Sequence, residues 1–519
     1  MWKKLLYRNA VAISPVRLDQ LRCVSVFPTS ATAATTTSTR ANTTAANVLS
    51  NKRFGQPVAL THPHLINRDE LVTGIKLDEF KQRRHRLMIG LQKYVAENTR
   101  GINRDKRHHA VIIPSSTKKY MSDKIPYVFR QNSDFYYLCG CLEPDTVLMM
   151  SIDDRNSIKS TLFMRPKDSH AELWEGTRTG VELASELFGV DESYPMDNFR
   201  PILIKLLQQQ KPLIWYDSRV SDLPQLNKQM VNVLETIKSQ EHLLSPIGLV
   251  HGMRLIKSPA EQDLMRRTCQ IASEAINDVM RCTKPGHSEH HIFAMIDYQC
   301  RLRNASYLAY PPVVASGANA TTIHYIENSQ LTKSGDLVLM DAGCEYGGYT
   351  SDITRTWPVN GEFSEPQKIL YEIVLELQKE LINIMLKEGG ETLDALFDTM
   401  CIKLGKYLQE VGIVSKSIDD LIGLGRAGYE FCPHHVSHYL GMDVHDTPQI
   451  PRNLTLLPGI VCTVEPGIYI SKDRSDVPKE FRGMGVRVED DILITSDNKI
   501  EILSDACVKE RTHLENLNK

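Results

Sequence analysis

Residues 338–352 read Val338-Leu-Met-Asp341-Ala-Gly-Cys-Glu-Tyr346-Gly347-Gly348-Tyr-Thr-Ser-Asp352, and this stretch decides the fold of the second half of the chain. Two strand-like runs that flank a glycine pair predict a β-hairpin. With a tight turn centred on Tyr346-Gly347, Asp341 is expected to lie directly opposite Asp352. Opposed side chains have Cβ atoms about 4.5–5.5 Å apart, where two like charges are destabilising. A shared cation explains the pair better than the alternative, two solvated acids on a surface strand.

A dense histidine cluster follows in residues 432–446, which read Cys432-Pro-His434-His435-Val-Ser-His438-Tyr-Leu-Gly-Met-Asp-Val-His445-Asp. Four of the 17 histidines of the chain fall within twelve consecutive residues here. A single histidine is most often structural, whereas a cluster of this density is typical of metal-binding or catalytic sites. The segment is therefore expected to supply an imidazole to the same site.

Two further acids lie downstream in apolar segments. Glu465 stands at an expected strand end in residues 463–469, and Arg487 and Glu489 share one face of a later strand, because side chains alternate along a strand. Each acid alone is equally typical of an ordinary surface position. Together with the hairpin pair they supply four carboxylates, which suit two divalent ions such as manganese better than a thiolate zinc site. Four negative charges would also balance two doubly charged cations.

The order Asp341, Asp352, His438, Glu465, Glu489 is similar to the dinuclear metal signature of the pita-bread metallopeptidases. Tyr310, residues 324–328 and residues 434–446 resemble the aminopeptidase P family, the Xaa-Pro aminopeptidases. Residues 56–64, 129–136 and 172–176 resemble the mitochondrial branch of that family, which includes the intermediate-cleaving peptidases. The resemblance covers residues 55–510. His435 stands where bacterial relatives tend to carry glycine, a local departure that leaves all five expected ligands in place.

The resemblance implies a role for each matching residue. Asp341 would hold one metal ion, Asp352 and Glu489 would bridge two ions, and His438 and Glu465 would complete the second ion. The implied substrate-binding residues are His324 and His445, which flank the substrate, Tyr310 near its amine, and His434 and Arg487 around a proline pocket. The implied catalytic residues are His324, His445 and Glu465, with Glu465 taking a proton from water and His445 stabilising the oxyanion. The implied cofactor is a pair of divalent metal ions, with Mn²⁺ expected.

The expected fold class is α+β, with a C-terminal pita-bread (creatinase/aminopeptidase) catalytic domain over residues 250–519. A smaller aminopeptidase P-like α/β domain over residues 55–245 precedes it. In the C-terminal part, Ser258-Pro-Ala-Glu261 predicts a capped helix that runs to about Lys284, and Ser288 and Ser364 begin two more helices. Strands are expected at 336–343, 349–359, 460–470 and 485–495, in a mostly antiparallel sheet. In the N-terminal part, strands at 110–113, 147–150 and 213–215 alternate with helices at 77–95 and 199–207.

Residues 1–50 differ from the rest of the chain in composition. They contain six basic residues, one acid and thirteen Ser or Thr. A secretory signal would require a continuous apolar stretch of about 7–15 residues, which this segment lacks. The bias therefore predicts a mitochondrial transit peptide and a location in the matrix, and the alternative is a compositionally biased disordered tail.

The composition of the whole chain excludes several classes of protein. The chain has 519 residues, of which 42% are hydrophobic and 24% charged, and its formal net charge of −2 gives no electrostatic case for nucleic-acid binding. No run of 18 apolar residues predicts a membrane-spanning helix. Eleven cysteines without a C-x-x-C pair favour free thiols in a reducing compartment. Residues 423–428 fit G-x-G-x-x-G formally, but no strand–turn–helix unit surrounds them, so no dinucleotide site is expected.

These features predict a metal-dependent aminopeptidase that acts on peptide N-termini. Its substrates would be Xaa-Pro peptides, mitochondrial precursor intermediates left by the processing peptidase, or both. Two alternatives are a prolidase restricted to Xaa-Pro dipeptides and a pita-bread binding protein without catalysis. The presence of all five expected ligands disfavours the second alternative. The expected partners are peptide or precursor N-termini and further copies of the chain, in a homodimer or a higher homo-oligomer.

Overall fold

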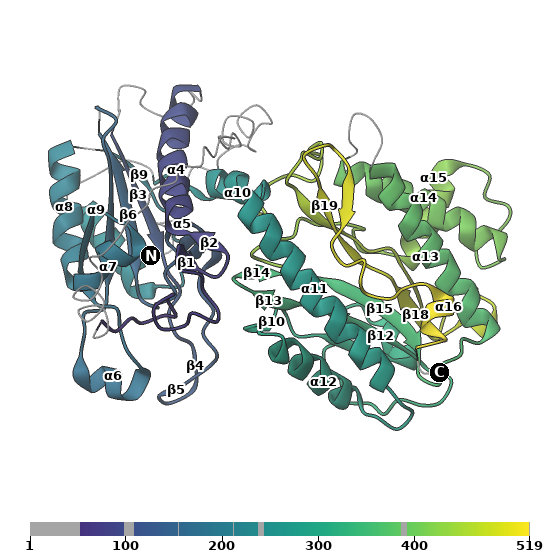
Figure 1. Cartoon of the computed structure of the whole chain (residues 1–519). Coiled ribbons are helices and arrows are strands. Elements are labelled where there is room, and N and C mark those ends of the chain that lie inside the picture. The colour runs from purple at the N-terminus through teal and green to yellow at the C-terminus, as the bar shows by residue number, and fades with distance from the viewer. Residues whose placement is uncertain are drawn as a thin grey trace, which may run out of the picture. The chain divides into compact units, whose positions relative to one another are not determined.

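The computed structural model describes residues 52–97, 108–153, 155–210, 212–236, 243–385 and 392–517. The chain forms two compact units, one ending at Arg254 and the other beginning at Leu255 (Figure 1). The transit peptide expected over residues 1–50 lies outside the described residues. Within the described residues, no helix has the length and hydropathy that a membrane crossing requires.

The N-terminal unit is built on a five-stranded mixed sheet with the order β8-β7-β6-β3-β9. Its strands are β3 (His109–Pro114), β6 (Val147–Ile152), β7 (Ile158–Met164), β8 (Glu192–Pro195) and β9 (Leu213–Trp215). β3 is buried along its whole length, as its unbroken apolar run requires, and it pairs antiparallel with β6 and parallel with β9. Helices α8 (Phe199–Gln210) and α9 (Pro224–Thr236) bury Phe199, Leu203 and Met230 in the core beside the sheet. The predicted strands and helices of this part, including α4 (Leu77–Glu97), are confirmed.

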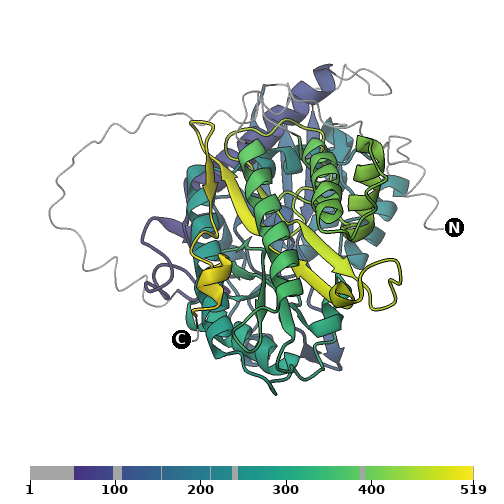
Figure 2. The same ribbon diagram turned by 90° about the vertical axis from the view of Figure 1, so that its right-hand side faces the viewer.

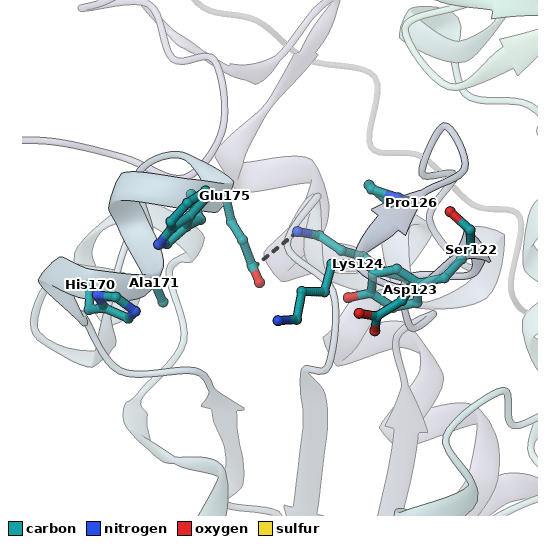
Figure 3. A pocket seen from close by; sticks show the side chains of 10 residues that line it. Ser122, Asp123, Lys124, Pro126, His170, Ala171 and Glu175 are labelled. Atoms are coloured by element: carbon teal, nitrogen blue, oxygen red, sulfur yellow. Dashed lines mark hydrogen bonds and ion pairs between the residues drawn. The ribbon is translucent and has the colours of Figure 1, made fainter.

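A pocket of about 1020 Å³ lies in this unit, lined by the hairpin of β4 (Tyr120–Ser122) and β5 (Ile125–Pro126) and by helix α6 (Ser169–Glu175). Figure 3 shows His170 and Glu175 on the helix side and Asp123 and Lys124 on the hairpin side. Lys118 Nζ lies 3.0 Å from a carboxylate oxygen of Glu175 and joins the two sides. None of the residues expected at the active site lines this pocket, because all of them belong to the C-terminal unit.

Local capping residues determine where the long helices of the C-terminal unit begin. α11 (Pro259–Cys282) begins with the predicted capping box, in which Ser258 Oγ accepts the Glu261 N–H and the Glu261 carboxylate accepts the Ser258 N–H. α12 (Glu289–Leu302) begins in the same way at Ser288, and α13 (Glu365–Met385) begins directly after Ser364. All three predicted helix starts are confirmed. α11 ends at Cys282, two residues before the predicted end, because Thr283 already has an extended backbone.

Every described strand pair of this unit is antiparallel, as expected. β12 (Leu337–Ala342) lies between β11 (Val313–Ser316) and β15 (Ile353–Pro358). β19 (Asp490–Ile494) lies between β16 (Val461–Val464) and β20 (Ile500–Ile502), and β17 (Gly467–Ile470) pairs with β18 (Met484–Arg487). β13 (Cys344–Tyr346) joins β10 (Tyr307–Leu308) to β14 (Tyr349–Thr350).

The strands predicted over 349–359, 460–470 and 485–495 are each broken in two, which corrects the expectation of continuous strands. The breaks fall at Ser351-Asp352, at Glu465-Pro466 and at Val488-Glu489. Pro466 explains the second break, because proline has no N–H to continue a ladder. Beside the first break, a Cβ on Gly343 would lie 1.7 Å from the Ser351 carbonyl oxygen, so this close approach requires glycine. Each break contains an acid that the sequence predicts as a metal ligand.

The hairpin register also differs from the prediction. Its turn is Gly347-Gly348, with φ of 60° and 85°, so the expected turn centred on Tyr346-Gly347 is wrong. Positive φ at both central residues matches the twist of the strands, and glycine adopts it without steric cost. Asp341 therefore pairs with Thr354, two residues beyond the predicted partner Asp352. A shift by two residues preserves the face of a strand on which side chains lie.

The formal G-x-G-x-x-G of residues 423–428 lies inside helix α15 (Leu421–Phe431). α15 packs beside α14 (Leu393–Glu410), as Figure 2 shows for the green helices. A Cβ on Gly428 would lie 1.9 Å from the carbonyl oxygen of Cys401 in α14. This glycine therefore allows the backbones of the two helices to approach closely.

Gly428→Ala is expected to destabilise the C-terminal unit by about 1–3 kcal/mol, because overpacking forces the two helices apart. Gly425→Ala is the matched control, since its Cβ would meet only Ile402 Cγ1 at 3.4 Å, an ordinary contact. Alanine at 425 should be neutral or should stabilise by up to about 1 kcal/mol through its higher helix propensity. Urea unfolding followed by circular dichroism measures both variants. Equal free energies of unfolding would contradict the packing argument.

Candidate metal centre and active site

The acids expected as metal ligands lie on or directly beside four separate strands. Asp341 lies on β12, Asp352 directly precedes β15, Glu465 directly follows β16, and Glu489 directly precedes β19. Ligand atoms of Asp352, His438 and Glu489 all lie within 4.8 Å of one another, and the three residues are buried. The strand breaks thus bring acids that are distant in sequence into one cluster.

Tyr310 links the two aspartates of the hairpin. Its hydroxyl oxygen lies 2.6 Å from Asp341 Oδ1 and 2.5 Å from Asp352 Oδ1. A hydroxyl carries one proton and can donate it to one of these oxygens at a time. Burial and the charges of both aspartates raise the pKa of Tyr310 well above its ordinary value, so the phenol stays protonated. Asp341 and Asp352 therefore converge although they are not paired across the hairpin.

Arg487 neutralises the second oxygen of Asp341. Its Nη2 donates to Asp341 Oδ2 at 2.6 Å, and its Nε donates to Thr354 Oγ1 at 2.9 Å. Burial raises the pKa of Asp341, and the guanidinium of Arg487 opposes that rise. The Thr354 hydroxyl in turn donates to Glu489 Oε2 at 2.6 Å. The arginine therefore holds one expected ligand directly and a second through Thr354.

His438 turns one ring nitrogen toward the acids and uses the other for orientation. Nε2 lies 3.2 Å from Asp352 Oδ2 and 3.6 Å from Glu465 Oε1, whereas Nδ1 lies 3.1 Å from the carbonyl oxygen of Tyr439. A carbonyl only accepts, so Nδ1 carries a proton and Nε2 faces the acids, as in a histidine metal ligand. Burial disfavours the charged ring, but the hydrogen bond to Asp352 and the charge of Glu465 raise the pKa of His438 to about 9.

Both glutamates of the cluster bind protons more tightly than usual. Burial raises the pKa of Glu465 to about 7, although the charge of His438 opposes the rise. Burial and the charge of Asp352 raise the pKa of Glu489 well above its ordinary value. Four ionised carboxylates would outweigh the two positive groups that contact the cluster, Arg487 and His438. Without a cation, bound protons therefore remove part of the negative charge.

This donor set fits divalent cations. Carboxylate oxygens and an imidazole nitrogen are ligands that divalent ions of intermediate hardness accept. A cation would replace the protons that the buried acids otherwise retain, which removes the repulsion among them. The chemistry of the side chains, and the charge that they would carry when ionised, thus agree with a metal centre.

The exposed histidines expected near the substrate lie beside this cluster. The rings of His445 and His438 meet edge to face, with centroids 4.6 Å apart. Burial and the charge of His438 lower the pKa of His445, and burial and the charge of Arg487 lower the pKa of His434 to about 3. A weaker electrostatic interaction with His324 contributes to both shifts.

His434 belongs to a hydrogen-bonded chain that ends on Arg487. Its Nδ1 lies 3.0 Å from the His435 carbonyl oxygen, so Nδ1 carries the proton and Nε2 accepts from the Tyr469 hydroxyl at 2.9 Å. The same hydroxyl oxygen accepts from Arg487 Nη1 at 2.8 Å. His434 Nδ1 also lies 3.5 Å from Glu465 Oε2. The structure thus brings all the residues predicted for the site into one region of the C-terminal unit.

Two neighbours of the ligands, Thr354 and Tyr469, were not predicted from the sequence. Thr354 stands two residues after Asp352, and a period of two along a strand was the available signal. Tyr469 follows Glu465 by four residues but shows no pattern that distinguishes it from a core aromatic residue. Only the folded chain brings its hydroxyl between His434 and Arg487.

Binding of a divalent cation at this cluster is expected to release protons at pH 7. His438, with a pKa of about 9, is protonated there in the metal-free protein, and Glu465, with a pKa of about 7, is partly protonated. A cation must displace these protons, so its apparent affinity should rise with pH through both pKa values. Calorimetric titration with Mn²⁺ in two buffers of different ionisation enthalpy measures the release. Identical apparent enthalpies in the two buffers would contradict it.

Comparisons with known families agree with the two units. Residues 263–496 match the model of metallopeptidase family M24, and residues 80–215 match the N-terminal domain of aminopeptidase P. The chain is 42% identical over 472 residues to Xaa-Pro aminopeptidase 3 of Mus musculus, covering 90% of this chain and 91% of that relative. It is 37% identical over 467 residues to mitochondrial intermediate cleaving peptidase 55 of Arabidopsis thaliana, covering 89% and 87%.

A solved structure extends the similarity to the fold. Zinc-substituted aminopeptidase P of Escherichia coli in complex with product matches with a TM-score of 0.77 at 33% identity, covering 86% of this chain and 98% of that one. The predicted pita-bread catalytic fold with a preceding N-terminal domain is thereby confirmed. The chain belongs to the aminopeptidase P family of M24 metallopeptidases.

Proposed function

We propose that this chain is a metal-dependent aminopeptidase that removes the N-terminal residue from Xaa-Pro peptides, from mitochondrial precursor intermediates, or from both. The convergence of Asp352, His438 and Glu489 within 4.8 Å carries the proposal, because buried acids and an imidazole at this spacing are suited to a hydrolytic metal. The names of the relatives, Xaa-Pro aminopeptidase 3 and intermediate cleaving peptidase 55, supply the two substrate classes.

The proposed cofactor is a pair of divalent ions, with manganese preferred. Asp341 would hold one ion, Asp352 and Glu489 would bridge both, and His438 and Glu465 would complete the other. When bound, such ions supply Lewis acidity at the scissile carbonyl and lower the pKa of water toward neutrality. The orientation of His438 Nε2 toward Asp352 and Glu465 supports this assignment.

The side chains of this protein would bind the peptide and move its protons. Glu465 would accept a proton from water and return it to the leaving amine. His324 and His445 would donate hydrogen bonds to the scissile carbonyl as negative charge develops on its oxygen. Tyr310 would lie at the free α-amine, which restricts the enzyme to peptide N-termini.

The proline-binding part of the site would be formed by His434 and Arg487. Tyr469 holds both of them through hydrogen bonds at 2.9 and 2.8 Å, so their side chains are ordered before a substrate binds. Side chains held in fixed positions suit the proline ring, because the shape of the ring varies little.

Turnover assays of the full chain test the proposal. The metal-free protein is reconstituted with Mn²⁺ or Zn²⁺ and offered three substrates: an Xaa-Pro-led peptide, a peptide with leucine or tyrosine first and no proline second, and an Xaa-Pro dipeptide. Metal-dependent release of the first residue from either peptide is the expected result. Cleavage of the dipeptide alone would favour a prolidase. Metal binding without any cleavage would favour a binding protein that has lost catalysis.

We further propose residues 1–50 as a mitochondrial transit peptide, residues 55–245 as the N-terminal domain and residues 250–519 as the catalytic domain. The mitochondrial relative and the basic, acid-poor start of the chain support a location in the matrix. Import into isolated mitochondria, with and without residues 1–50, tests the location. Import that does not depend on these residues would contradict it.

A homodimer or higher homo-oligomer is the proposed assembly. Leu173 and Trp174 on α6 are 79% and 77% exposed, and large apolar side chains exposed in this way are typical of protein interfaces. Light scattering of the full chain measures the assembly. A monomer at all concentrations would exclude it.

A further inference from the structure

Glu289 is a buried acid that the proposed mechanism does not use. It is the first residue of helix α12 and has 0% exposure. Its carboxylate accepts five hydrogen bonds. Oε1 accepts from Ser316 N at 2.8 Å, Ser316 Oγ at 2.7 Å and Asn319 Nδ2 at 2.9 Å, and Oε2 accepts from Tyr325 Oη at 2.8 Å and Gln330 N at 2.9 Å.

These donors lie at both ends and in the middle of one surface loop, residues 316–330. Ser316 is the last residue of β11, and Gln330 also accepts the backbone N–H of Glu289 through its carbonyl oxygen at 2.8 Å. A single carboxylate therefore closes the loop at its base. The loop carries His324, one of the two exposed histidines of the proposed site.

The other face of the loop is held against a strand of the site. Its first turn packs on β18, because a Cβ on Gly485 would lie 2.0 Å from the carbonyl oxygen of Ala320. Near its end, Asn328 is buried, has φ of 52°, and bonds to Val314 N and to the Pro312 carbonyl oxygen, both at 2.9 Å. The loop is thus fixed at its turns, and Tyr325, directly after His324, is anchored on Glu289.

We propose that Glu289 is a positioning residue for His324. By holding Tyr325 and both ends of the loop, it fixes the backbone on either side of the imidazole. The role of His324 at the substrate belongs to the proposed function, so this inference rests on it. A carboxylate is required because both oxygens face only donors, and its charge is favoured at the N-terminus of a helix.

The sharpest variant is Glu289→Gln, which keeps the shape of the side chain. In either orientation, the amide N–H₂ would face a backbone N–H, which cannot accept, so at least one of the five hydrogen bonds is lost. The manganese-loaded full chain is expected to retain its metal but to lose about 10–100-fold in kcat/KM, as for a misplaced catalytic group. Combined with His324→Ala, Glu289→Gln should cause no further loss, because it acts through His324.

Glu365→Gln is the matched control. Glu365 is also the first residue of a helix, α13, but its side chain is 80% exposed and pairs with Lys368 at the surface. This variant removes the same charge from the same helix position and should leave kcat/KM unchanged. Unchanged kcat/KM in Glu289→Gln, or losses that multiply in the double variant with His324→Ala, would overturn the proposal.

Two further measurements keep the proposal testable if Glu289→Gln does not fold or if the wild type shows no activity. Tyr325→Phe removes one donor and leaves the carboxylate, and a loss of about 3–10-fold that disappears in the His324→Ala background is expected. Hydrogen–deuterium exchange of residues 317–330 tests the anchoring without any activity assay. Faster exchange is expected in Tyr325→Phe and not in Glu365→Gln, and equal exchange would overturn the anchoring. Absence of activity in the wild type, with this exchange pattern present, would reject only the proposed function.

Discussion

Glu489→Ala is expected to lower kcat/KM by at least about 10³-fold and to release bound metal, because the variant removes the carboxylate proposed to bridge two ions. The carboxylate of Glu489 lies within 4.8 Å of ligand atoms of Asp352 and His438, and the Thr354 hydroxyl orients it at 2.6 Å. Without it, the remaining acids would have fewer oxygens with which to hold a second ion. Turnover of an Xaa-Pro peptide and the metal content by mass spectrometry measure the two effects.

Glu501→Ala is the control for this variant. Glu501 lies on β20, next to β19, and its carboxylate binds Arg266 Nε at 2.8 Å at the surface of the unit. The control should keep both metal ions and full turnover. Two bound ions and near-normal turnover in Glu489→Ala itself would refute the bridging role.

Arg355→Ala is expected to lower the free energy of unfolding of the C-terminal unit by about 3–5 kcal/mol. Arg355 is 0% exposed and uses all of its donors. Nε donates to the Val508 carbonyl, Nη1 to the carbonyls of Thr354 and Glu489, and Nη2 to Asp490 and the Cys507 carbonyl. Burial opposes the charge on Asp490, but Arg355 and Lys509 hold the pKa of that carboxyl well below its usual range. Removing the guanidinium leaves a buried charge with one fewer partner and several carbonyls without donors.

Arg266→Ala measures what an arginine at the surface contributes. Its ion pair with Glu501 is partly exposed, so its loss should cost less than about 1 kcal/mol. Urea unfolding of both variants, followed by circular dichroism, gives the two free energies. Similar values for the two variants would show that the buried network around Arg355 contributes no more than a surface pair.

The sequence predicts well those features that are determined within a few residues. The capping box of Ser258 and Glu261 satisfies its donors inside one helical turn, so a motif of four residues is enough to predict where α11 begins. The continuous apolar run of β3 likewise indicates a strand buried on both faces. The order of the five expected ligands indicated the family, and their individual roles stay predictions.

Tertiary structure decided how the acids meet. Pro466 accounts locally for the break after Glu465, but the break at Asp352 depends on what lies beside the strand. The approach of Gly343 to the Ser351 carbonyl is one such contact, and no pattern in residues 349–359 encodes it.

The sequence by itself therefore determined the family, the helix starts and the set of acids and histidines available for chemistry. The strand break at Asp352 and the hydrogen bonds by which Glu289 holds the His324 loop required the folded chain. The physical reason is the separation in sequence of the groups that interact. A helix cap or an alternating strand is stabilised by groups within a few residues. A buried carboxylate is instead satisfied by donors, such as Tyr325 on Glu289, that lie 36 residues away in sequence.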